Sequence, residues 1–194
     1  MATNVPSEFK DNLQVYLDDG YKLGGGQYKH INNWTHLSIQ LMEARCFLEI
    51  AEKNFGGEPD TDMDKILMQQ ALFRSFTLAY GKCFTSGGRG RTKLEKEDIF
   101  STNPDLKVIH DRIMDIRHKF SAHSDINDLE MAILVIKETS EGIDVRQTYT
   151  LALPVDEFSD FQMVISHVET LVIHKRQKAV ESIESKSNKP MWFR

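Results

Sequence analysis

The sequence predicts a mainly α-helical fold, an antiparallel bundle of four to five helices with a β-hairpin before the last helix. Apolar residues recur at intervals of three and four over long segments, and short turn-rich connections separate these segments. This pattern is typical of antiparallel helices that bury one face each. From about residue 129 to 154 a β-branched run is followed by alternating apolar and polar residues, which indicates two paired strands.

The composition indicates one globular domain. The chain has 194 residues, 40% of them hydrophobic and 27% charged, with a net charge of −5. A negative chain has no global attraction to nucleic acid, so any nucleic-acid site must be a local patch. Cys46 and Cys83 match no metal or redox spacing, which favours a reduced, cytoplasmic protein. No apolar run approaches the ~20 residues of a membrane span, and we expect neither membrane attachment nor a signal peptide.

Residues 1–29 precede the main domain. A short helix is predicted over 7–19, and the glycine-rich stretch DGYKLGGGQYK ends it. The main domain is expected over 30–182, followed by a flexible polar tail at 183–194.

Two long helices open the main domain, at about 30–55 and 62–84, with the turn-rich GGEPDTD between them. The apolar stripe of the first is in heptad register and suits a core or a dimer interface. It comprises Trp34, Leu37, Leu41, Ala44, Leu48, Ala51 and Phe55. The second carries Ile66, Phe73, Phe76, Tyr80 and Phe84.

A third helix is predicted to begin at Pro104, with Asn103 as N-cap and Asp105 in the first turn. It extends to about Ala122, roughly 28 Å at 1.5 Å per residue. Its apolar stripe comprises Ile109, Ile113, Ile116 and Phe120, of which we expect Ile113, Ile116 and Phe120 to be buried.

The hairpin and the last helix complete the domain. LEMAILVIKE forms the first predicted strand, TSEG the turn, and Ile143 begins the alternating second strand. Asp156 is the expected cap of the last helix. The apolar face of that helix comprises Phe158, Phe161, Ile165, Val168 and Val172.

The stretch DIRHKFSAHSD, at the end of the third predicted helix, concentrates cationic and titratable side chains. His123 lies near the negative end of the helix dipole, which favours a protonated imidazole. A histidine that titrates near neutrality beside the guanidinium of Arg117 can act as acid or base on a phosphate ester. The alternative is that these cations only stabilise a helix terminus. The spacing of arginine, four to six residues, then histidine also occurs by chance, as Arg112 and His118 show.

The motif RHKFSAH resembles the hallmark of the HEPN superfamily (higher eukaryotes and prokaryotes nucleotide-binding domains). In this family an arginine, commonly followed by Asn, Asp or His, precedes a histidine by four to six residues. The competing RIMDIRH does not fit, because Ile113 follows its arginine. Residues 30–180 also resemble the family's helix order, in particular the abortive-infection type of prokaryotic HEPN protein.

The resemblance implies a metal-independent endoribonuclease that acts as a homodimer in toxin–antitoxin or antiphage defence. Its substrate would be RNA, and an antitoxin protein would be a further partner. Arg117 and His123 correspond to the catalytic pair and His118 to the polar neighbour. Some HEPN toxins carry, two residues after the histidine, a tyrosine that an antitoxin modifies. This chain has Asp125 there, so that mode of neutralisation is not predicted.

These residue types suit RNA cleavage without a metal or cofactor. RNA carries its own nucleophile, the 2′-hydroxyl, from which His123 can take the proton. Arg117 can bind the phosphate and stabilise the charge of the transition state. His118, His123 and Asp125 could be combined as metal ligands, but they match no ligand motif, so we expect no metal.

Basic residues outside the motif are candidates for RNA binding. GGRGRTK could hold a phosphate through backbone N–H groups and arginines, or it could be a solvated linker. The RNA-binding candidates are Arg89, Arg91, Lys93 and Lys119. The five histidines outside the motif are expected at the surface or at helix caps: His30, His36, His110, His167 and His174. Two other functions stay open: a catalytically silent HEPN-like module that binds RNA, nucleotide or a protein, and a plain helical interaction protein.

Overall fold

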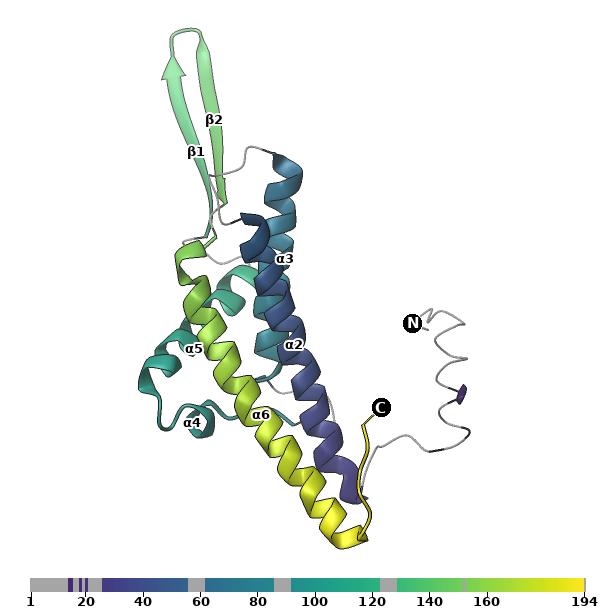
Figure 1. The fold of residues 1–194 in the computed structure, drawn as a ribbon. Helices are drawn as coiled ribbons and strands as arrows, with labels where there is room; N and C mark the ends of the chain where they lie inside the picture. The colour runs from purple at the N-terminus through teal and green to yellow at the C-terminus, as the bar shows by residue number, and fades with distance from the viewer. Residues whose placement is uncertain are drawn as a thin grey trace.

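Three long helices, α2 (Lys29–Phe55), α3 (Met63–Lys82) and α6 (Phe158–Ser187), form the body of the molecule (Figure 1). The predicted fold class is confirmed: the chain is mainly helical, with an antiparallel hairpin before the last helix. The computed structural model describes residues 14–15, 18, 20, 26–55, 62–85, 92–122, 129–151 and 153–193. Most of the helix predicted over 7–19 and of the glycine-rich stretch after it lies outside these residues.

Helices α2 and α6 run antiparallel along their whole length. Ile31, near the start of α2, packs against Ile183 near the end of α6. At the opposite end of the pair, the Gln162 amide donates a hydrogen bond to the Glu52 carboxylate. The short connection between α2 and α3 makes that pair antiparallel as well, as the bundle pattern predicts.

Aromatic side chains fill the centre of the bundle. The ring of Phe73 in α3 lies 5.7 Å from the ring of Phe76 and 5.7 Å from that of Phe158, measured between centroids. Phe120 adds a third neighbour at 6.1 Å. Seven positions of the predicted α2 and α3 stripes are fully buried: Leu41, Ala44, Leu48, Ala51, Phe73, Phe76 and Tyr80.

Helix α5 (Pro104–Ile116) begins where the sequence predicts, with Pro104 in its first turn and Asn103 at the N-cap. The Asn103 side chain makes no capping hydrogen bond. The predicted helix does reach residue 122, but its last six residues form a π-helical segment, η2 (Arg117–Ala122). The predicted burial of Ile113, Ile116 and Phe120 is confirmed, each being at most 2% exposed.

The hairpin, β1 (Glu130–Thr139) and β2 (Gly142–Leu151), projects beyond the helical body (Figure 1). Thr139 pairs with Gly142, and the Thr139 hydroxyl donates to the Gly142 carbonyl oxygen across the turn. Apolar side chains are exposed on both faces of the sheet, so the hairpin does not cover the core. They are Ile133, Leu134, Val135, Ile136, Ile143 and Val145.

Short segments connect these elements: η1 (Gly26–Tyr28), α4 (Lys96–Ile99) and η3 (Val155–Glu157). Asp156, the predicted cap of the last helix, lies within η3, and Glu157 occupies the N-cap position of α6 without a side-chain cap bond. The helix also ends later than expected. It runs through Ile183, which is buried, and stops at Asn188, whose left-handed φ of 52° is typical of a helix C-terminus.

Candidate functional site

Arg117 lies where α5 passes into η2, and its side chain crosses α3. A methyl group placed on Gly81 of α3 would be 3.2 Å from the Cγ, Cδ and Nε atoms of Arg117. The Arg117 Nε is buried, and no described residue offers it a hydrogen-bond partner. Arg117 also forms no ion pair with any carboxylate among the described residues. Within the described residues, the guanidinium charge of Arg117 is therefore not paired with a carboxylate.

Arg112, the competing motif arginine, has a different environment. Its Nε and Nη2 atoms donate to the two carboxylate oxygens of Glu157, each at 3.0 Å. This bidentate ion pair joins α5 to η3, and both side chains are about one-third exposed. Arg112 therefore stabilises the packing of α5, while Arg117, five residues later, has no such carboxylate within the described chain.

The π-helical segment η2 packs against α3 through Phe120. In a π-helix the backbone hydrogen bonds reach five residues rather than four, and such segments occur frequently at functional sites. Phe120 is buried, and the Arg74 guanidinium lies 4.4 Å from its ring centroid. This cation–π contact brings a second arginine, Arg74 of α3, to the segment that begins with Arg117.

Of the remaining motif residues, the structure describes His118 and Lys119 but not His123. His118 and Lys119 are exposed on η2. The Lys119 ammonium pairs with the Asp115 carboxylate at 3.0 Å, so part of its charge is compensated. His123, the predicted catalytic histidine, lies outside the described residues.

Of the basic-loop candidates, Arg89 and Arg91 also lie outside the described residues, while Lys93 is described and exposed. Lys93 pairs with Glu95 at 3.1 Å, and no hydrogen bond or ion pair of the described residues joins it to Arg117.

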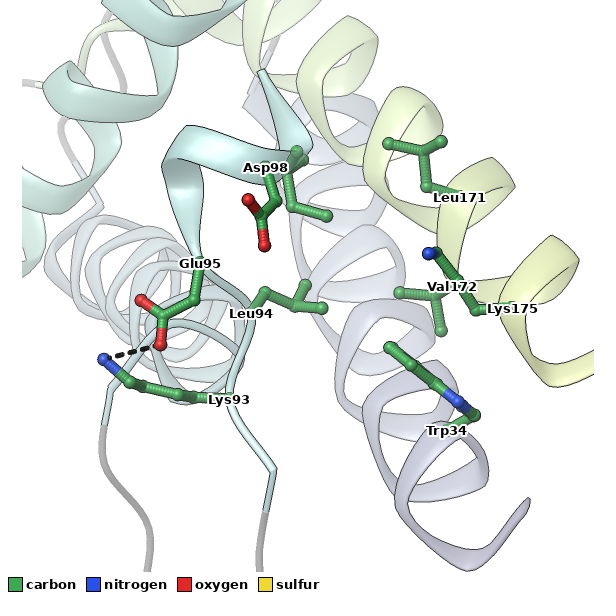
Figure 2. A pocket seen from close by; sticks show the side chains of 9 residues that line it. Trp34, Lys93, Leu94, Glu95, Asp98, Leu171, Val172 and Lys175 are labelled. Atoms are coloured by element: carbon green, nitrogen blue, oxygen red, sulfur yellow. Dashed lines mark ion pairs between the residues drawn. The ribbon is translucent and has the colours of Figure 1, made fainter. Parts of the chain in front are cut away.

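Lys93 instead borders a pocket of about 190 Å³ between the start of α2, α4 and α6 (Figure 2). Trp34 and Val172 provide apolar walls, while Asp98 and Lys175 extend from opposite sides. Pockets for drug-sized ligands measure roughly 300–1,000 Å³, so this one is small. Its charged side chains are exposed, and it shares no lining residue with the Arg117 site.

His110 is buried, and its predicted surface position is wrong. Its Nδ1 shares a 2.7 Å hydrogen bond with the Tyr80 hydroxyl, and the Phe84 and Phe100 rings enclose it. Burial is the main reason that the pKa of His110 falls to about 4. Burial likewise raises the pKa of Tyr80 well above its usual value. His110 is therefore a neutral core residue at pH 7.

Sequence reasoning missed Gly81 as a contact of Arg117. One signal was present, because a glycine inside a strongly helical segment weakens the helix and often marks a close approach of another group. Nothing in the sequence shows which group approaches, since Gly81 and Arg117 meet only through the packing of η2 on α3.

Comparison with family models, characterised proteins and solved structures finds no match for this chain. Among the residues that the structure describes, no helix is both long and apolar enough to span a membrane. Within the same residues, no three histidine, cysteine, aspartate or glutamate side chains lie close enough to hold a metal ion.

Proposed function

We propose that this protein is a metal-independent endoribonuclease of the HEPN type. The observation that carries the proposal is the state of Arg117. It is the arginine of the HEPN-like motif RHKFSAH, its stem is held against α3, and no described residue neutralises it. An uncompensated guanidinium in a half-buried position suits the recognition of a phosphate group.

The reaction needs two proton transfers and one charge-stabilising group. One His123 takes the proton of the RNA 2′-hydroxyl, and the 2′-oxygen attacks the adjacent phosphorus. The bond from phosphorus to the 5′-oxygen breaks, and a second, protonated His123 donates a proton to that oxygen. Arg117 stabilises the charge on the non-bridging oxygens. The products carry a 2′,3′-cyclic phosphate and a 5′-hydroxyl.

The two histidines would come from two copies of the chain. A two-fold dimer brings the same residue of each protomer to its axis and therefore supplies both histidines to one cleft. We propose such a homodimer, with its interface including the C-terminal part of the segment at 104–122. A role in toxin–antitoxin or antiphage defence in the cytoplasm, with an antitoxin protein as partner, belongs to the same proposal.

The test is cleavage of a mixed-sequence single-stranded RNA in EDTA, with the same sequence made as DNA for comparison. Wild-type protein should cut the RNA, leave 2′,3′-cyclic phosphate ends and spare the DNA. His123→Ala removes the proton-transfer group and should lower the rate by about 10²–10⁴-fold. Arg117→Ala should lower it by about 10²–10³-fold.

The matched control is Arg112→Ala, which removes an arginine of the same helix that is already paired with Glu157. Its folded fraction should cut RNA at the wild-type rate. Cleavage that stops in EDTA and returns with a divalent metal would reject the mechanism. RNA binding that needs Arg117 without any cleavage would favour the catalytically silent module.

A further inference from the structure

Gly81 occupies an unusual position for a glycine. It is buried in the last turn of α3, and its φ is not positive. The conformational freedom of glycine is therefore not used here, and glycine is among the residues least favourable to a helix. The reason for a glycine at this position must be the space that its missing side chain leaves.

The side chain of Arg117 fills that space. Three of its atoms, Cγ, Cδ and Nε, lie 3.2 Å from the point where a Cβ of residue 81 would stand. Ordinary van der Waals contacts between such atoms are about 3.5–4.0 Å. A Cβ on residue 81 would be a few tenths of an ångström too close, so the Arg117 side chain would have to shift away from the α3 backbone.

The α3 backbone is not free to move away. The Gly81 carbonyl oxygen accepts hydrogen bonds from the backbone N–H groups of Phe84 and Thr85, both at 3.1 Å, and from the Thr85 hydroxyl at 3.0 Å. These bonds fix the end of α3. A methyl group at position 81 would therefore displace the Arg117 side chain and not the helix.

We propose that Gly81 is a positioning residue for Arg117: by lacking a side chain, it lets the arginine stem lie on α3 and so fixes the guanidinium for an RNA phosphate. The contact itself is independent of any activity, but the role toward RNA rests on the proposed function. The two parts are therefore tested by separate measurements.

A double-mutant cycle on thermal stability tests the contact. Gly81→Ala is compared in the wild-type chain and in Arg117→Ala, which lacks the three crowded atoms. In the Arg117→Ala background alanine should raise Tm, because it favours the helix more than glycine does. In the wild-type chain it should lower Tm or leave it unchanged. An equal Tm shift in both backgrounds would overturn the contact.

Cleavage and binding then test the role. If Gly81 acts through Arg117, Gly81→Ala should lower kcat at least 10-fold, and Gly81→Ala with Arg117→Ala should be no slower than Arg117→Ala alone. Affinity for a 2′-O-methyl RNA, which lacks the nucleophile, should fall in the same pattern. Wild-type kcat and affinity in Gly81→Ala, with both lost in Arg117→Ala, would refute the positioning role.

A wild-type protein that neither cuts nor binds RNA would refute the proposed function and the role of Gly81 toward RNA. The double-mutant cycle on thermal stability would still decide whether Gly81 and Arg117 are in contact.

Discussion

The burial of His110, which shares a hydrogen bond with Tyr80, makes the stability of the fold depend on pH. The pKa of His110 is about 4 in the folded chain, lowered mainly by burial and partly restored by Asp111, against an ordinary value of 6.5. Between these pH values the unfolded chain binds a proton that the folded chain does not. The free energy of unfolding should therefore fall as the pH drops from 6.5 to 4, by about 3 kcal/mol.

Urea denaturation at several pH values from 7 to 4.5 measures this loss. The control is Tyr80→Phe combined with His110→Phe, which removes both polar groups and leaves neither unpaired. Its stability should depend less on pH over the same window. An equal pH dependence in the two proteins would show that other groups cause it.

The two motif arginines should separate stability from activity. Arg112→Ala removes two charge-assisted hydrogen bonds to Glu157, so the free energy of unfolding should fall by about 1–2 kcal/mol. Arg117→Ala removes no hydrogen bond or ion pair to another described residue, only the packing of its stem on α3, and should lower this free energy by less than Arg112→Ala does. Urea denaturation of both variants compares them. A larger loss in Arg117→Ala would mean that Arg117 is a structural residue.

The sequence alone predicts that Arg117 is the candidate catalytic arginine, but it does not predict which residues surround Arg117 or Arg112. The motif pattern separates Arg117 from Arg112 through the residue that follows each arginine. The pairing of Arg112 with Glu157, 45 residues away, depends on the packing of η3 against α5. The burial of His110 is not predicted for the same reason, because its partners Tyr80 and Phe84 lie in and just after α3, far away in the sequence.

Among the elements, η2 depends most on one side chain. Phe120 is 2% exposed and packs between Phe73 and the Arg74 guanidinium. Phe120→Ala should lower the free energy of unfolding by about 3–5 kcal/mol, because it leaves a cavity that α3 and η2 cannot close. Chemical denaturation measures this, and a loss below about 1 kcal/mol would show that the helix is wrongly phased.

Element boundaries follow the sequence where local signals set them. Asp62 caps α3 with its own side chain, and Pro104 begins α5 as its fixed φ favours. The change from α-helix to π-helix at Arg117 cannot be predicted locally, because the segment RHKFSA contains no proline or glycine. The position at which α6 ends also cannot be predicted from local sequence, because Ile183 is buried by packing against Ile31 at the start of α2.

For the whole molecule, the hairpin is the part least supported by the core. Leu134 and Ile136 are 60% and 58% exposed. Leu134→Thr with Ile136→Thr puts a β-branched residue, which favours a strand, at both positions, so it should change the free energy of unfolding by less than about 0.5 kcal/mol. Thermal denaturation measures the change. A large loss would indicate that these side chains are buried in the folded protein in solution, for example in an assembly.

The shared cleft of the proposed nuclease requires a dimer at the concentrations where it cuts. Light scattering at micromolar concentration should therefore give twice the chain mass. Mixing equal amounts of wild-type and His123→Ala chains should lower cleavage to about one quarter of the wild-type rate, because only a dimer of two wild-type chains keeps both histidines. The Arg112→Ala chain is the control, since mixing it with wild type should change nothing. A monomer that cuts RNA, or a mixture that keeps about half of the wild-type rate as independent chains would, would refute the shared cleft.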